Sequence, residues 1–105
     1  MKAVNRRLSE ARLKKLAQEV TGRGDPLEAL EETLRSYIEQ KLNHYGQEIN
    51  RLEHKYGLSH EAFVRKLGRE LPLTWEHEQD YMAWEEALIN REYFQKLRTQ
   101  LKVHG

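Results

Sequence analysis

The sequence predicts a mainly α-helical protein built around one long central helix. Apolar residues recur every three or four positions between residues 25 and 57, which is the helical period. Capping residues and glycines stand where such helices would begin and end. Apolar residues make up 38% of the chain and charged residues 33%, so the core is thin and association would add stability. We therefore expect a dimer with a short N-terminal strand or an extended first helix, the central helix, and a C-terminal helical hairpin or arm.

The N-terminal residues 2–8 fit two structures. Two apolar residues, Val4 and Leu8, lie four positions apart, which suits one turn of helix or one face of a short strand. Ser9 can then cap a helix of about twelve residues. One face of this helix carries Leu13, Leu16, Ala17 and Val20. A four-residue turn with two glycines follows and makes the clearest break in the chain.

The central helix is marked at both ends. Asp25 can accept hydrogen bonds from the first turn, Pro26 fits the first helical position, and Gly57 is a typical left-handed stop. At 1.5 Å per residue the helix is roughly 45 Å long. An apolar stripe of this length needs a partner along its face, from this chain, a second copy or another protein. The stripe consists of Leu27, Leu30, Leu34, Ile38, Leu42, Tyr45, Ile49, Leu52 and Tyr56.

Two further helices are predicted after the central one. Ser59 caps a short helix that Pro72 closes, and Thr74 caps a long last helix. Acidic residues in its first turn and basic residues near its end have the signs that the helix dipole favours. The apolar residues of this last helix are Trp75, Tyr81, Met82, Trp84, Leu88, Ile89, Phe94, Leu97 and Leu101.

Charge is distributed unevenly along the chain. Residues 1–24 contain seven Lys or Arg and two Glu, a net charge of +5, whereas residues 25–105 carry a net charge of −4. Six acids and no Lys or Arg occur from Glu70 to Glu86. A basic head and an acidic tail predict different partners for the two ends, although solvated helical surfaces also vary in charge.

Several function classes receive little support. The chain has no cysteine, no apolar run near the ~20 residues of a membrane span and no signal peptide, so we expect a cytoplasmic protein without a disulfide or membrane partner. No zinc-protease motif or glycine-rich phosphate loop occurs. His77 and Asp80 share a helix face, but a metal site needs a third ligand. We expect no enzymatic activity, metal, cofactor or small-molecule substrate.

The first forty residues carry a recognisable pattern. From Val4 they read VNRRLSEARLKKLAQEVTGRGDPLEALEETLRSYIE, which resembles the ribbon-helix-helix antitoxins, especially the VapB-like group. These proteins have a short basic strand, a capped helix, a glycine turn and a second helix. The matching residues are Val4, Leu8, Ser9, Leu13, Leu16, Thr21, Gly22, Asp25, Ala29, Leu30, Leu34, Tyr37 and Ile38.

The C-terminal half has a second resemblance. The segments KYGLSHEAFVRKL and TWEHEQDYMAWEEAL resemble small helical antitoxin-type proteins encoded beside TumE-like toxins. The two resemblances imply a dimerising, DNA-binding module over residues 1–43 and a toxin-binding arm over residues 44–105, joined by the continuous central helix. The residues that carry the second match are Tyr56, Gly57, Ser59, Phe63, Trp75, Asp80, Tyr81, Trp84 and Glu85.

The ribbon-helix-helix resemblance implies that paired strands enter the major groove of operator DNA. Asn5 and Arg7 would then read base edges, while Lys2, Arg6 and Arg12 would contact phosphates. If residues 2–8 are helical instead, this readout does not apply. DNA affinity would then be weak and nonspecific.

The toxin-binding arm would use large aromatics on an acidic helix to cover a basic cleft on the cognate toxin. The same aromatics could instead pack against the central helix. We thus expect an antitoxin of a type II toxin–antitoxin system that also regulates its own operon. The alternative is a non-enzymatic dimeric helical-bundle adaptor with no nucleic-acid role. The residues expected to contact the toxin are Phe63, Trp75, Tyr81, Trp84, Glu85 and Phe94.

Overall fold

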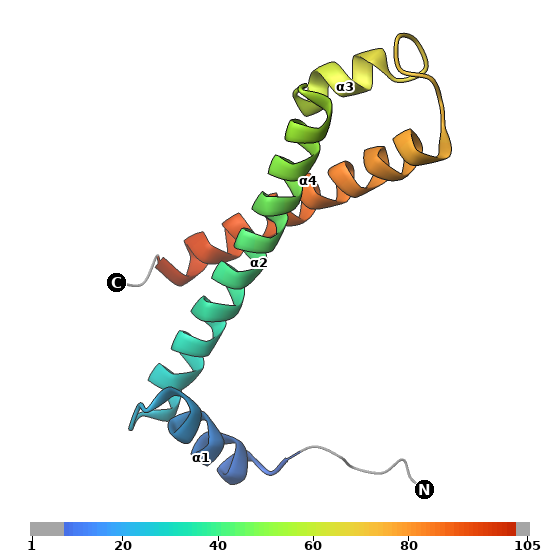
Figure 1. The fold of residues 1–105 in the computed structure, drawn as a ribbon. Helices are drawn as coiled ribbons and strands as arrows, with labels where there is room; N and C mark the ends of the chain where they lie inside the picture. The colour runs from blue at the N-terminus through green and yellow to red at the C-terminus, as the bar shows by residue number, and fades with distance from the viewer. Residues whose placement is uncertain (1–7, 103–105) are drawn as a thin grey trace, which may run out of the picture. The chain divides into compact units, whose positions relative to one another are not determined.

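The computed structural model describes residues 8–102, and this part of the chain forms helices joined by short connections (Figure 1). The predicted mainly helical class is confirmed, and residues 8–102 form no strand. The expected strand over residues 2–8 lies outside the described residues except for Leu8, which is irregular. The helices are α1 (Glu10–Thr21), α2 (Pro26–Tyr56), α3 (His60–Lys66) and α4 (Trp75–Lys102).

The chain divides into two compact units, one ending at Tyr37 and the other beginning at Ile38. Helix α2 passes through this boundary without a break, as the sequence predicts. The boundary lies six residues before the predicted division between residues 43 and 44.

The N-terminal unit contains α1 and the first turns of α2. The Ser9 hydroxyl accepts a hydrogen bond from the Arg12 N–H at 3.2 Å, so the predicted cap of α1 is confirmed. Helix α1 ends where Gly22 adopts a φ of 74°, a conformation that glycine accepts at little cost. Within residues 8–37 the one fully buried side chain is Ala29. This unit therefore has almost no hydrophobic core of its own.

The apolar face predicted for α1 is only partly covered. Leu16 and Ala17 are half-buried, whereas Leu13 and Val20 are 57% and 80% exposed. The turn that follows is held by Arg23, whose Nε lies 2.7 Å from Glu32 Oε1. Polar contacts therefore close this turn, and they leave apolar surface of α1 in water.

The ends of α2 match the sequence prediction to within one residue. Asp25 Oδ1 accepts a hydrogen bond from the Leu27 N–H at 3.0 Å, and Pro26 is the first helical residue. After Tyr56 the chain leaves the helix at Gly57, which has a φ of 64°. Local capping chemistry thus sets the length of α2.

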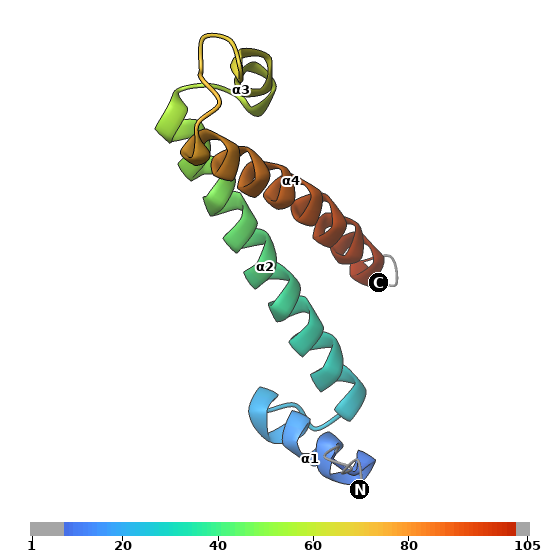
Figure 2. The same cartoon turned by 90° about the vertical axis from the view of Figure 1, so that its right-hand side faces the viewer.

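The C-terminal unit is a helical hairpin in which α3 reverses the chain and α4 folds back against the second half of α2 (Figure 2). Ser59 caps α3, and the Thr74 hydroxyl caps α4 by accepting from the His77 N–H at 3.0 Å. Fully burying each large apolar side chain contributes about 1.5–3 kcal/mol, so this core holds the hairpin closed. The core consists of Ile49, Leu52, Phe63, Trp84 and Ala87.

Candidate functional site

Most of the predicted DNA-binding residues lie outside the described part of the chain. These are Lys2, Asn5, Arg6 and Arg7, so the base-reading prediction is untested. Arg12 is described and stands exposed on α1. It lines a shallow surface depression together with Lys15, Leu16 and Glu19. Two cations one turn apart can meet phosphate oxygens, although Glu19 reduces the positive charge at this point.

Two of the predicted toxin-contacting residues form the centre of the C-terminal core. Phe63 and Trp84 are both 0% exposed, and their ring centroids lie 5.2 Å apart. Tyr56 packs against both rings at centroid distances of 4.7 and 6.4 Å. These side chains offer no surface to a partner in this conformation, so burial does not support the predicted contact through Phe63 and Trp84.

Three other predicted contact residues are half-buried within the hairpin. Tyr81 packs against the hydrophobic core, and Phe94 stacks on Tyr45 with ring centroids 6.0 Å apart. Glu85 Oε2 lies 2.5 Å from His60 Nε2. Each of these side chains is already engaged in holding α4 to α2 or α3, and only part of its surface faces solvent.

Trp75 is the predicted contact residue that stands in solvent, with 78% of its surface exposed. Met82, Ile89 and Tyr93 follow it along α4 and are 59%, 63% and 56% exposed. Spacings of seven, seven and four residues place all four on one side of the helix. The buried residues of α4, Asp80, Trp84 and Ala87, occupy the opposite side. We call Trp75, Met82, Ile89 and Tyr93 the outer row.

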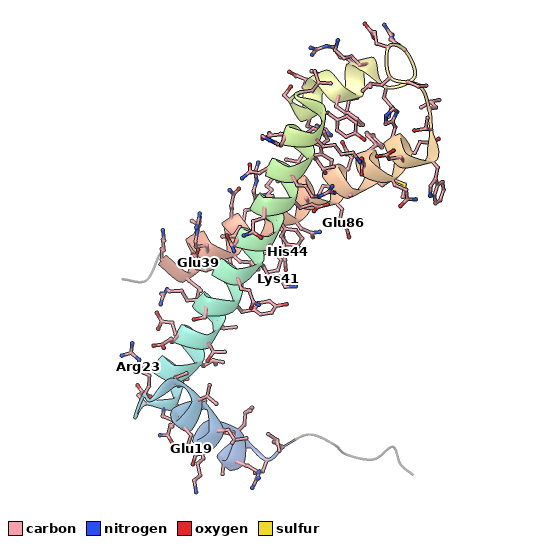
Figure 3. The ribbon with its side chains drawn as sticks, in the orientation of Figure 1. Glu19, Arg23, Glu39, Lys41, His44 and Glu86 are labelled. Carbon is pink, nitrogen blue, oxygen red and sulfur yellow. The ribbon has the colours of Figure 1, made fainter. Side chains whose placement is uncertain are left out.

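Carboxylates flank the outer row. Glu78 and Glu86 lie three or four residues from the row's members, and Glu92 lies three residues after Ile89, so all three border the row on the helix surface (Figure 3 labels Glu86). The salt bridges formed among residues 8–102 involve none of the three. The face therefore combines large apolar side chains with a net negative charge.

This face is not predicted as a unit from the sequence. Met82 and Ile89 are among the apolar residues expected in the last helix, whereas Tyr93 is not among them. The signal was present in the spacing, because steps of seven and four residues from Trp75 separate the outer row from Trp84 and Leu88. Sorting the apolar residues of this helix by angle would have found two stripes instead of one.

A polar cluster around the buried carboxylate of Asp80 fastens α4 to the end of α2. Asp80 is 9% exposed, its Oδ2 lies 2.6 Å from Lys55 Nζ, and Tyr56 donates its hydroxyl proton to the same oxygen. Lys55 Nζ also lies 2.6 Å from Glu76 Oε2. Burial opposes ionisation of Asp80, but the hydrogen bonds from Lys55 and Tyr56 outweigh it and hold the pKa of Asp80 below its ordinary value.

The pKa values of Tyr56 and Lys55, the two partners of Asp80, are both raised. Burial first, and then the hydrogen bond to Asp80, raise the pKa of Tyr56 to about 12. Hydrogen bonds to Asp80 and Glu76 raise the pKa of Lys55. At neutral pH the cluster therefore holds an ammonium, a carboxylate and a neutral phenol that satisfy one another, which is the arrangement of a structural clasp.

The residues considered for a metal site are engaged elsewhere. His77 Nδ1 donates to the Pro72 carbonyl at 2.6 Å, and Asp80 is held by Lys55 and Tyr56. Within residues 8–102 no three His, Asp or Glu side chains are grouped in a way that could hold a metal ion.

Over the same range, no helix has both the length and the apolar character that crossing a bilayer requires.

Comparison of the chain with protein-family models, with curated protein sequences and with solved structures finds no match. The antitoxin resemblance therefore remains an expectation from the motifs of the sequence.

Proposed function

We propose that this chain is a non-enzymatic antitoxin of a type II toxin–antitoxin system. Its C-terminal unit binds and neutralises a cognate toxin protein in the cytoplasm. Its N-terminal unit forms a homodimer and represses the operon by binding operator DNA. The observation that carries the proposal is the outer row, because a hairpin that already has a closed core exposes four large apolar side chains beside unpaired carboxylates.

The chemistry of the outer row matches what an inhibitor of a nucleic-acid-cleaving toxin needs. Such a toxin presents a basic cleft to its RNA substrate, and carboxylates on the inhibitor steer its approach and compete for the same cations. Trp75 and Tyr93 supply the aromatic anchors that often dominate the binding energy of an interface. Inhibition of this kind requires coverage of the toxin's cleft and no chemistry by the chain itself.

The proposed dimerisation is supported by exposed apolar residues on the first half of α2. Leu27, Leu30, Leu34 and Tyr37 are 73%, 51%, 44% and 50% exposed. Their spacing of three, four and three residues is that of a helix-pairing seam. Since Ala29 is the one fully buried side chain within residues 8–37, a second copy would supply the apolar contacts that this unit lacks.

The proposed DNA binding is supported by the basic residues of the N-terminal segment and by the exposed cations of α1. Arg12 and Lys15 are placed to contact phosphates, and Asn5 and Arg7 are the proposed base readers. A gel-shift titration of the chain against its own upstream DNA tests this half. Joint replacement of Asn5 and Arg7 by alanine abolishes the preference for that DNA over scrambled DNA. Arg12→Ala weakens the binding of both DNAs and lowers the slope of log affinity against log salt concentration by about one.

The toxin-binding half is tested by growth. Expression of the adjacent gene product alone arrests growth, and co-expression of this chain restores it if the proposal holds. Co-expression of a truncated chain of residues 38–105 should also restore growth, since toxin binding is assigned to the C-terminal unit. An adjacent gene product that is harmless, or that arrests growth regardless of this chain, contradicts the proposal.

The second candidate function is a dimeric helical adaptor with no nucleic-acid role. The exposed seam of α2 favours it, because Leu27, Leu30 and Leu34 can pair helices without any strand. The two functions separate in the gel-shift experiment. An adaptor gives weak DNA binding that disappears at moderate salt and shows no preference between upstream and scrambled DNA.

A further inference from the structure

We propose that the outer row of α4 is the docking face for a partner protein that presents an apolar groove bordered by Lys or Arg. This inference rests on the proposed function to the extent that the toxin would be this partner. The four residues of the row all lie in the C-terminal unit, and their exposure does not depend on the identity of the partner. The outer row replaces the buried and half-buried aromatics of the hairpin as the principal contact surface.

The geometry of the row suits a long, narrow contact. From Trp75 to Tyr93 it extends roughly 27 Å at 1.5 Å per residue, along one side of a continuous helix. The opposite side of α4 is committed to the core through Trp84 and Ala87. A partner can therefore cover the row without opening the hairpin, and the free and bound chains keep the same fold.

The composition of the row is that of an interface core. Soluble proteins expose single apolar side chains freely, but an aligned set of Trp, Met, Ile and Tyr forms a continuous apolar stripe in water. Aromatic residues and Met are enriched at the centres of protein interfaces. The C-terminal unit also exposes Val64 and Leu73, which lie on α3 and on the connection to α4 and are not part of this stripe.

Charge decides the chemistry of the partner. Glu78, Glu86 and Glu92 border the row, and Lys96 borders its C-terminal end three residues after Tyr93. Arg91, next to Glu92, lies on the opposite side of the helix. A partner surface with Lys or Arg beside its groove gains from these carboxylates, and an acidic surface is repelled by them. The face therefore selects a basic partner.

The same charges disfavour a second copy of this chain as the occupant. An antiparallel pair of α4 helices joined through the row would bring Glu78 of one copy near Glu92 of the other. A parallel pair would bring Glu78 and Glu92 of one copy near the same residues of the other. Both arrangements place like charges beside the apolar contact, which destabilises helix pairing.

The inference is tested with variants that change this face alone. The apolar variant combines Met82→Ser with Ile89→Ser, and the charge variant combines Glu78→Gln with Glu86→Gln. The matched control is Val64→Ser, an exposed apolar residue on α3 that is 40% accessible. All these side chains are exposed, and circular dichroism with a thermal melt shows whether each variant keeps the fold.

Two probes are titrated into the full chain and monitored by tryptophan fluorescence. One is the purified adjacent gene product. The other is a synthetic tryptophan-free amphipathic helix of Leu and Lys, with a Leu and Glu helix of equal length as its control. We expect the apolar variant to bind the adjacent gene product and the Leu and Lys helix at least about tenfold more weakly than the wild type. We expect the charge variant to reduce this binding mainly at low salt. We expect Val64→Ser to behave as the wild type.

The outcomes separate this inference from the proposed function. If the adjacent gene product binds and the variants do not weaken it, the docking face is wrong and the antitoxin proposal stands. If only the Lys peptide binds, and the apolar variant abolishes that binding, the face stands and the antitoxin proposal fails. Equal binding of the Lys and Glu peptides overturns the basic-partner inference. Self-association that the apolar variant removes also overturns it, because a second copy is then the occupant.

Discussion

The hydroxyl of Tyr56 donates a hydrogen bond to Asp80 Oδ2, which joins the last residue of α2 to the second turn of α4. Lys55 contacts the same carboxylate from the neighbouring position, at 2.6 Å. At the other end of the hairpin, Arg98 and Glu39 approach to 3.4 Å on the surface. The half-buried clasp and the apolar core therefore fix how α4 lies on α2, and this fixes which side of α4 faces solvent.

Replacing Asp80 by alanine should destabilise the hairpin by about 2–3 kcal/mol, because it leaves Lys55 and Tyr56 without their shared acceptor in a half-buried site. Urea unfolding followed by tryptophan fluorescence measures this loss, because Trp84 passes from the core into water. The control is Glu76→Gln, which removes only the exposed contact to Lys55 and should cost less than about 1 kcal/mol. Equal losses for the two variants would show that Asp80 is not the centre of the clasp.

The clasp should also make the free energy of unfolding depend on pH in the acidic range. The pKa of Asp80 is lowered from its ordinary 3.8 in the folded protein, so the unfolded chain binds protons more tightly. The stability that ionised Asp80 contributes is complete above that ordinary value and is lost as the pH falls through the lower folded value. We expect the free-energy difference between wild type and Asp80→Asn to shrink as the pH falls from about 5 to below 3.8. A constant difference over this range would contradict the assignment.

Tyr56 should lose its phenol proton at a higher pH than an exposed tyrosine. Burial and the bond to Asp80 raise its pKa from 10.0 to about 12, so the folded protein keeps the phenol proton after the unfolded chain has released it. Its contribution to stability is therefore complete below about pH 10 and is lost as the pH rises through about 12. The difference between the ultraviolet titrations of wild type and Tyr56→Phe isolates this group. A difference curve with its midpoint near 10 would mean that the site is open to water.

Phe63 should be indispensable for α3. It is the buried residue of this short helix and contacts Tyr56 and Trp84. Phe63→Ala should cost about 3–5 kcal/mol in the free energy of unfolding, because it leaves a cavity in a core of few residues. The neighbouring Val64→Ala removes a 40% exposed side chain and should cost under about 1 kcal/mol. Thermal melts of the two variants, compared with the wild type, test the difference.

Helix ends could be predicted from the sequence because capping is local chemistry. Ser9, Asp25 and Ser59 each accept the backbone hydrogen bond expected of them, and Gly22 and Gly57 adopt the left-handed conformation that ends a helix. These interactions join residues at most a few positions apart. A single sequence contains all the information they need.

Which side of α4 is buried could not be predicted in the same way. The helix carries apolar residues over much of its circumference, and packing against Ile49, Leu52 and Phe63 decides which of them are buried. Likewise the sequence places Asp80 on one helix face with His77 and without a third metal ligand, whereas the fold brings Lys55 to it across 25 positions of sequence. Both outcomes depend on contacts between distant segments, which periodicity does not encode.

The central claim, that the outward side of α4 binds the toxin, is tested most directly by fluorine NMR. The chain has two tryptophans, Trp75 in solvent and Trp84 in the core, so labelling with 5-fluorotryptophan gives one signal for each environment. On addition of the unlabelled adjacent gene product, the account predicts that the Trp75 signal shifts and loses its sensitivity to heavy water, while the Trp84 environment is retained. A saturated complex in which the Trp75 signal keeps its position and its solvent sensitivity would contradict the account.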